Sequence, residues 1–151
     1  MHARYAQRRA QLCQRAAQEG IDCLVLVPGT NLFYLTGLEM HLSERVTLLF
    51  IPVPSGEPAW FTPLLESERA RKATGIEQGR AWGDAEDPVT VLRELFRDLG
   101  LAQRTGLRLG CEFRALRLLE WDLLEQVAPG AVRVDIGPLM AELRCRKDDE
   151  E

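Results

Sequence analysis

The feature that most constrains the fold is a short, almost entirely apolar run at residues 21–27, which only Asp22 interrupts. A strand that is apolar at successive positions is expected where helices cover both faces of a sheet. A helix predicted at residues 3–19 precedes this strand and stops at Gly20, and a turn at residues 28–30 follows it. The chain therefore begins with a helix that leads into a strand buried in the middle of a sheet.

Strands and helices alternate along the rest of the chain. A second apolar strand is predicted at residues 46–51, where Pro52 stops it, and it pairs back with residues 59–62 as a hairpin. Because the hairpin adds antiparallel pairing, the pattern predicts an α/β fold with a mixed β-sheet flanked by helices on both faces. The other predicted elements are a helical turn at 31–35 capped by Thr30 or Asn31, helices at 63–71, 88–99 and 115–127, and strands at 76–81, 107–111 and 132–136.

Helical spacing also predicts which side chains face the core. The helix predicted at residues 88–99 has the clearest start, with Asp87 as its N-cap and Pro88 in its first turn. We expect this helix to bury Leu92, Leu95 and Phe96. The same spacing places Tyr5, Arg9, Leu12 and Ala16 on one face of the first helix, and turns Leu116, Leu119, Leu123 and Val127 of the 115–127 helix inward.

Composition and missing motifs exclude several functions. The 151 residues fit one domain, and a net charge of -4 offers no basic surface for nucleic acid. No secretory signal and no apolar run of about 18 residues is visible, which indicates a cytoplasmic protein without a membrane partner. The four cysteines form no C-x-x-C pair, and only His2 and His41 could add imidazole ligands. We therefore expect no metal, no cofactor and no catalytic residue in this chain.

Three weaker features have plain structural interpretations. Residues 28–31 follow the first strand, where α/β sheets often bind ligands, but a single glycine there fits an ordinary strand-to-helix turn. The acidic block at residues 148–151 fits a solvated segment better than a metal cluster. A nuclease of this fold would need carboxylates on the central strands, and these carry only Asp22 and Asp135, which does not support a nuclease.

The run Asn31-Leu32-Phe33-Tyr34-Leu35-Thr36-Gly37, placed between two strands, resembles the start of the creatinase/prolidase/aminopeptidase P family. Residues 143–150 resemble the connector that leads into the catalytic domain of that family. The resemblance implies a ribonuclease H-like N-terminal domain at residues 1–136, with Asn31, Tyr34 and Gly37 as its structural signature. It also implies that residues 137–151 connect to a catalytic domain outside this sequence.

The resemblance implies a function for the longer protein. This chain would be the non-catalytic N-terminal domain of a metal-dependent Xaa-Pro dipeptidase or aminopeptidase, inactive alone, that contributes to dimerisation and to the rim of the substrate cleft. Its partners would be the catalytic domain, a second subunit and a peptide with proline at the second position. The catalytic domain would hold two divalent metal ions (manganese, cobalt or zinc). The alternative is a stand-alone protein- or peptide-interaction module of the same fold.

The resemblance also points to the loop at residues 38–45. In the family, the equivalent loop ends in an arginine fourteen residues after the signature Asn and reaches toward the partner's catalytic cleft. Arg45 lies fourteen residues after Asn31, and His41 is the other candidate for the cleft rim. A guanidinium there can bind a substrate carboxylate through two parallel hydrogen bonds. The alternative is a surface loop on which His41 is merely exposed and Arg45 pairs with Glu44 or another nearby carboxylate.

Overall fold

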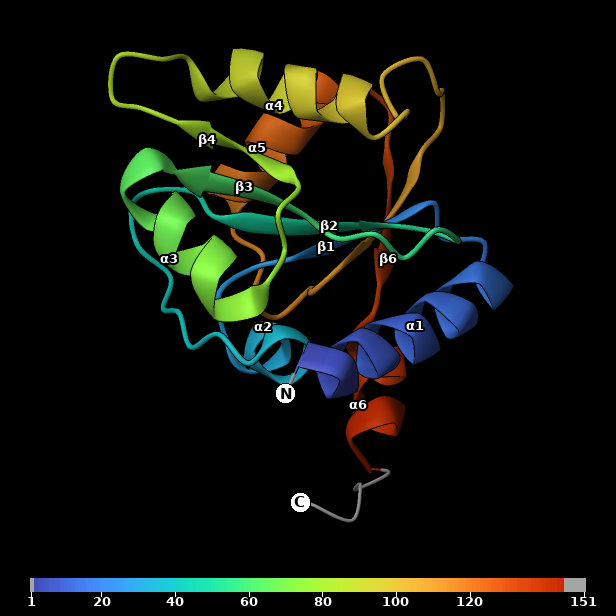
Figure 1. Cartoon of the computed structure of the whole chain (residues 1–151). Helices are drawn as coiled ribbons and strands as arrows, with labels where there is room; N and C mark the ends of the chain where they lie inside the picture. The colour runs from blue at the N-terminus through green and yellow to red at the C-terminus, as the bar shows by residue number, and fades with distance from the viewer. Residues whose placement is uncertain (1, 146–151) are drawn as a thin grey trace.

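The predicted alternation of helices and strands is confirmed in the computed structural model, which describes residues 2–145 (Figure 1). Each predicted element is present, including the short strand expected near residues 76–81. The strands are β1 Cys23–Leu26, β2 Leu48–Pro52, β3 Ala59–Pro63, β4 Gly79–Trp82, β5 Arg108–Cys111 and β6 Val132–Asp135. The helices are α1 His2–Gln18, α2 Thr30–Thr36, α3 Leu64–Thr74, α4 Pro88–Asp98, α5 Leu118–Val127 and α6 Gly137–Cys145.

The strands form one mixed sheet in the order β4-β3-β2-β1-β5-β6. Strand β2 runs antiparallel to both of its neighbours, whereas β1, β5 and β6 are mutually parallel and β3 is parallel to β4. Five strands therefore point the same way, and their carboxyl ends lie along one edge of the sheet. We call this the carboxyl edge; it comprises residues 30–31, 64–65, 83–87, 112–118 and 135–138, with the loop at residues 37–47 that enters β2. The opposite amino edge comprises residues 19–22, 53–58 and 100–107.

Two apolar layers cover the sheet. Helices α1, α2, α3 and α6 pack on one face, where Leu12, Leu32 and Met140 are among the buried side chains. Helices α4 and α5 pack on the other face around Phe96 and Leu124. The whole of β1 is buried, which confirms the strand covered on both faces that the apolar run predicts.

The predicted faces are correct for α4 and wrong in part for α1 and α5. Helix α4 buries Leu92, Leu95 and Phe96, and the Asp87 carboxylate accepts hydrogen bonds from the backbone of Val89 and Thr90. Helix α1 buries Leu12 and Ala16 as predicted, but Arg8 is buried in place of Tyr5 and Arg9. The reason is that the Arg8 guanidinium lies 3.9 Å from the centre of the Tyr34 ring and donates to the Tyr34 carbonyl at 3.1 Å.

Helix α5 begins three residues later than predicted, and its phase differs. It buries Glu120 and Leu124, while Leu119 is 44% exposed. A turn in which the backbone of Ala115 and Leu116 donates to the Glu112 carbonyl precedes the helix. The Glu120 carboxylate then caps the start by accepting from the Arg117 backbone at 2.8 Å and from its guanidinium. This charged cap turns a carboxylate inward, where hydrophobic spacing alone predicts leucine.

Candidate functional site

The loop at residues 37–47 is fixed to the rest of the domain at several points. The Leu38 backbone donates to the Thr36 hydroxyl at 3.1 Å, and Met40 is buried. Arg69 of α3 donates to the Glu39 carbonyl at 3.1 Å, and the Trp82 indole donates to the Val46 carbonyl at 3.2 Å. Between these anchors His41 is exposed. The loop therefore presents His41 from a backbone that is already positioned.

Arg45 lies at the end of this loop, partly exposed, and pairs with Asp84 of the segment after β4. Its two terminal nitrogens reach the two oxygens of the Asp84 carboxylate, at 2.9 and 3.3 Å. The side chains are 38% and 73% exposed, and an ion pair this open to water contributes at most about 1 kcal/mol. The sequence-based alternative of a local ion pair is thus present, with Asp84 and not Glu44 as the carboxylate. The guanidinium already holds a carboxylate in the bidentate geometry.

The three signature residues have structural roles. Gly37 ends α2 with a φ of 76°, and a Cβ at this position would lie 2.6 Å from the Tyr5 ring, so another residue would be strained and would displace that ring. The Tyr34 hydroxyl donates to the Leu143 carbonyl at 3.3 Å, which ties α2 to α6. Contrary to prediction, neither Thr30 nor Asn31 caps α2. The N-cap residue is Gly29, so no side chain accepts a hydrogen bond at the start of this helix.

The Asn31 side chain instead bonds to Glu112, a residue that the sequence patterns do not reveal. The Asn31 amide donates to one Glu112 oxygen at 2.8 Å, and the Val27 backbone donates to the other at 2.9 Å. Arg144 donates to the Asn31 carbonyl oxygen at 3.3 Å. Glu112 is 8% exposed, and burial raises the pKa of its carboxyl, although the two hydrogen bonds act in the opposite direction. The available signal was its place directly after an apolar strand.

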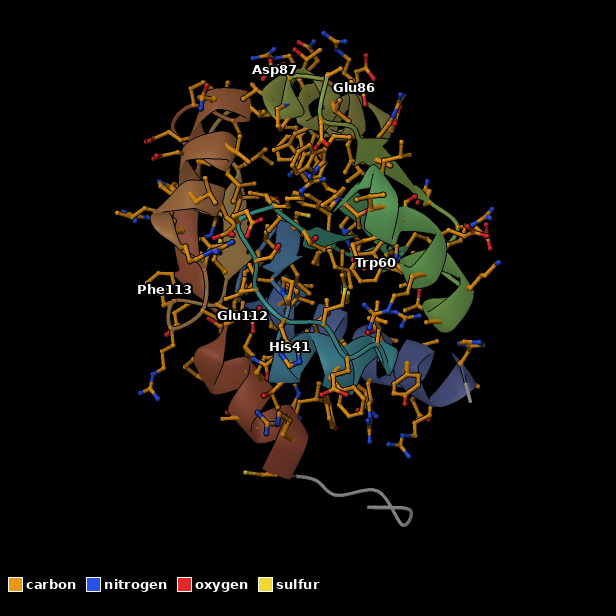
Figure 2. The ribbon with its side chains drawn as sticks, turned by 90° about the vertical axis from the view of Figure 1, so that its left-hand side faces the viewer. His41, Trp60, Glu86, Asp87, Glu112 and Phe113 are labelled. Carbon is orange, nitrogen blue, oxygen red and sulfur yellow. The ribbon has the colours of Figure 1, made fainter. Side chains whose placement is uncertain are left out.

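A cavity of about 460 Å³ opens beside this carboxylate. Figure 2 views the molecule from the side on which His41, Glu112 and Phe113 all lie toward the viewer. We call the cavity the switch-point pocket; Asn31, Glu112, Phe113, Arg114, Asp135 and Arg144 are among the residues that line it. The structure therefore places the loop that carries His41 and a second polar site along the same edge of the sheet.

Comparison with known families decides the relationship. The model of the Creatinase/Prolidase N-terminal domain matches residues 8–146 of this chain. The chain belongs to this family. The fold agrees, because the Creatinase/Prolidase N-terminal domain of an X-PRO dipeptidase from Streptococcus pyogenes has the same arrangement, with a TM-score of 0.72 at 21% identity over 94% of this chain and 99% of that one.

Several proteins similar to this creatinase/prolidase N-terminal domain are described as dipeptidases. The probable dipeptidase PepE of Mycobacterium tuberculosis is 36% identical over 87 residues, which are 56% of this chain and 23% of that protein. The solved dipeptidase PepE from Mycobacterium ulcerans is 28% identical with a TM-score of 0.80, covering 99% of this chain and 39% of that one. The matched segment thus spans about a quarter of the length of the curated relatives.

One similar structure is a chain of comparable extent. A solved proline dipeptidase chain from Streptococcus pneumoniae is 27% identical with a TM-score of 0.79, covering 92% of this chain and 98% of that one. A domain of this size has therefore been solved as a chain of its own.

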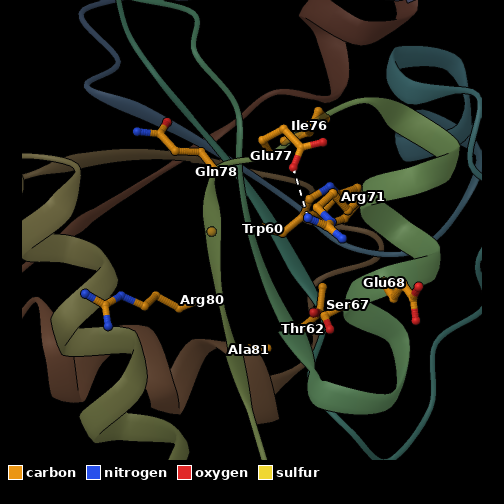
Figure 3. Close-up of a pocket in the computed structure, with 11 residues that line it drawn as sticks. Trp60, Thr62, Ser67, Glu68, Arg71, Ile76, Glu77, Gln78, Arg80 and Ala81 are labelled. Carbon is orange, nitrogen blue, oxygen red and sulfur yellow. Dashed lines mark hydrogen bonds and ion pairs between the residues drawn. The ribbon is translucent and has the colours of Figure 1, made fainter.

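A second cavity, of about 350 Å³, lies between α3 and β4 of the creatinase/prolidase N-terminal domain (Figure 3). Three of its larger polar side chains already have partners within the domain. Arg71 pairs with Glu77 at 3.3 Å, the Trp60 indole donates to the Thr74 hydroxyl at 3.3 Å, and Arg80 points toward α4, where it pairs with Asp98. This cavity offers weaker polar recognition than the switch-point pocket.

The described residues of this domain carry no metal site. Within residues 2–145, no three His, Cys, Asp or Glu side chains are grouped closely enough to hold a metal ion. The acidic block at residues 148–151 lies outside the described residues. Cys23 and Cys111 are buried as predicted, and burial also raises the pKa of the Cys13 thiol to about 11, which makes it a poor nucleophile. Among the described helices, none is both long and apolar enough to cross a membrane.

Proposed function

We propose that this chain is the N-terminal domain of a metal-dependent Xaa-Pro dipeptidase and helps to form the dimer and the rim of its substrate cleft. The observation that carries the proposal is the Arg45 guanidinium, partly exposed on an anchored loop and already paired with a carboxylate. Relatives named as dipeptidases support the reaction class, and they are long enough to contain a further domain. The longer protein is a cytoplasmic homodimer in this proposal.

The chemistry belongs to the rest of that protein. The described residues do not fit a pair of divalent metal ions, because they offer no group of three or more ligands. Manganese, cobalt or zinc would therefore be held by the catalytic domain. This chain supplies recognition: Arg45 exchanges the Asp84 carboxylate for the carboxylate of a peptide with proline at its second position. His41 lies at the rim beside it.

Steady-state kinetics of the full-length enzyme test the role of Arg45. Arg45→Ala should raise KM for a Xaa-Pro dipeptide more than it lowers kcat, because the guanidinium contacts substrate and transition state alike. Metal content should stay unchanged. Arg45→Lys should restore part of the affinity, since lysine keeps the charge but loses the bidentate geometry.

The matched control is Arg104→Ala at the amino edge. Arg104 is also partly exposed and pairs with an aspartate, Asp22, at 2.5 Å. Its removal should leave KM and kcat at wild-type values. Wild-type constants for Arg45→Ala would remove this residue from the substrate cleft and reduce its pair with Asp84 to a surface ion pair.

The second candidate function is an interaction module without peptidase activity. It is favoured by four large apolar side chains that are more than half exposed at the carboxyl edge, namely Leu64, Leu65, Phe113 and Leu118. Reading the coding sequence beyond Glu151 separates the candidates: a following domain with metal-ligating Asp, His and Glu supports the peptidase, and a stop codon supports the module. In both cases residues 1–151 alone should hydrolyse no Xaa-Pro peptide.

A further inference from the structure

The chain changes direction across the sheet between β1 and β5. Strands β2, β3 and β4 extend the sheet on one side of β1, and the chain then crosses to place β5 and β6 on the other side. Helix α2 leaves β1 toward one face of the sheet, and α5 follows β5 on the opposite face. The segments that follow the two strands therefore separate and leave a crevice between them. In open α/β sheets, crevices at such switch points are the usual places for ligands.

The switch-point pocket fills this crevice. Its volume of about 460 Å³ lies within the range of small-molecule sites, roughly 300–1,000 Å³. Asn31 comes from the segment after β1, and Glu112 and Phe113 come from the segment after β5. Asp135 ends β6, and Pro138 and Arg144 come from α6. Segments far apart in the sequence thus converge on one hollow, which local sequence could not show.

The polar groups of the pocket favour a ligand that carries a positive charge. Glu112 is almost fully buried, and both of its hydrogen bonds come from neutral donors, the Val27 backbone and the Asn31 amide. Each carboxylate oxygen can accept a second hydrogen bond, so the group has room for an ammonium donor. Asp135 adds a second carboxylate to the lining, and one of its oxygens accepts from the Gly137 backbone at 2.9 Å.

The same pocket also offers groups for an anion and for an apolar side chain. Arg114 and Arg144 both line it, and a guanidinium can bind a carboxylate. Phe113, which is 54% exposed, lines the pocket together with Pro138 and Met140. Acidic groups, basic groups and an open aromatic ring in one hollow match a small molecule that carries both charges.

We propose that the switch-point pocket binds a small zwitterion, a free amino acid or a dipeptide. Its ammonium group binds Glu112 and Asp135, its carboxylate binds Arg114 and Arg144, and its side chain lies against Phe113. Neither Arg45 nor His41 lines this pocket, so the site is separate from the proposed cleft rim. Binding there does not depend on peptidase activity, because every group named belongs to the described domain.

The test is an NMR titration of the 151-residue chain with alanyl-proline and with free proline as probes. Amide signals of Asn31, Glu112, Phe113 and Gly137 should shift and saturate. N-acetyl-alanyl-proline and alanyl-prolinamide, which each lack one charge, should bind about tenfold more weakly or worse, a loss of about 1.4 kcal/mol.

Two exposed residues provide variants that keep the fold. Arg114→Ala and Phe113→Ala should each weaken binding, whereas Phe33→Ala, which removes a similarly exposed ring outside the pocket lining, should leave it unchanged. Glu112→Gln keeps the shape and should abolish ammonium binding, and its melting curve shows whether it is folded.

Three results would overturn the proposal. The first is no saturable shift at these residues with either probe. The second is equal binding of the singly charged analogues. The third is wild-type affinity in both Arg114→Ala and Phe113→Ala. Failure of Arg45→Ala to change KM would contradict the peptidase role and leave this titration unaffected.

Discussion

The two edges of the sheet differ in how completely their side chains find partners within the chain. At the amino edge, the Asp22 carboxylate accepts from Arg104 at 2.5 Å and from the Arg108 backbone at 2.8 Å, and the Arg108 side chain donates to the Gly20 carbonyl. At the carboxyl edge, Leu65 and Leu118 are 79% and 78% exposed, and Arg45 holds a weak surface pair. Apolar groups exposed together mark a contact surface. We therefore expect the carboxyl edge to be the functional side of the domain.

The largest expected effect contrasts a leucine of the core with one of the carboxyl edge. Leu95→Ala should lower the free energy of unfolding by about 2–5 kcal/mol, because Leu95 is fully buried between α4 and the sheet. Leu65→Ala should change it by less than about 0.5 kcal/mol, because Leu65 is 79% exposed. Denaturant unfolding of both variants makes the measurement. A large loss of unfolding free energy in Leu65→Ala would mean that this part of the carboxyl edge stabilises the fold and is not simply a contact surface.

A smaller effect concerns pH. Because the folded state raises the pKa of Glu112, it keeps a proton that the unfolded chain loses near pH 4.3. The stability contributed by this group is therefore greatest below that pH and falls as pH rises toward the folded pKa. Glu112→Gln should remove this fall.

Asp98 acts in the opposite direction, because its hydrogen bonds from Arg80 lower its pKa, so its contribution is lost as pH falls. Subtracting the unfolding curves of Glu112→Gln from those of the wild type isolates Glu112. The quantity compared is the free energy of unfolding of the wild type minus that of Glu112→Gln. If this difference stays constant from pH 4 to above the folded pKa, or grows in favour of the wild type, then burial does not penalise the charged carboxylate.

The fold was largely readable from the sequence, because apolar runs and helical spacing are local signals. The apolar run at residues 21–27 predicted β1, and the Asp87-Pro88 pair predicted the start of α4. The phase of α5 was not readable, since it depends on the Arg117–Glu120 cap and not on apolar spacing. The family resemblance, carried by residues 31–37, is confirmed.

The site was predicted only in part. The resemblance alone points to Arg45 and His41, and their place at the cleft rim stays a prediction. Asp84, 39 residues along the chain from Arg45, was missed because β3 and β4 must first form before the two meet. Glu112 was missed for the same reason: its bond to Val27 spans 85 residues and exists only because β1 and β5 are neighbours.

Hydrogen–deuterium exchange tests the central claim most directly, by comparing residues 1–151 alone with the same residues in the full-length protein. We expect slower exchange in the full-length protein at the 37–47 loop and at residues 64–67 and 112–118, where the carboxyl edge would meet the rest of the enzyme. Exchange at residues 19–22 and 100–107 of the amino edge should be unchanged. Slower exchange at the amino edge, with no change at the carboxyl edge, would contradict the assignment of function to the carboxyl edge.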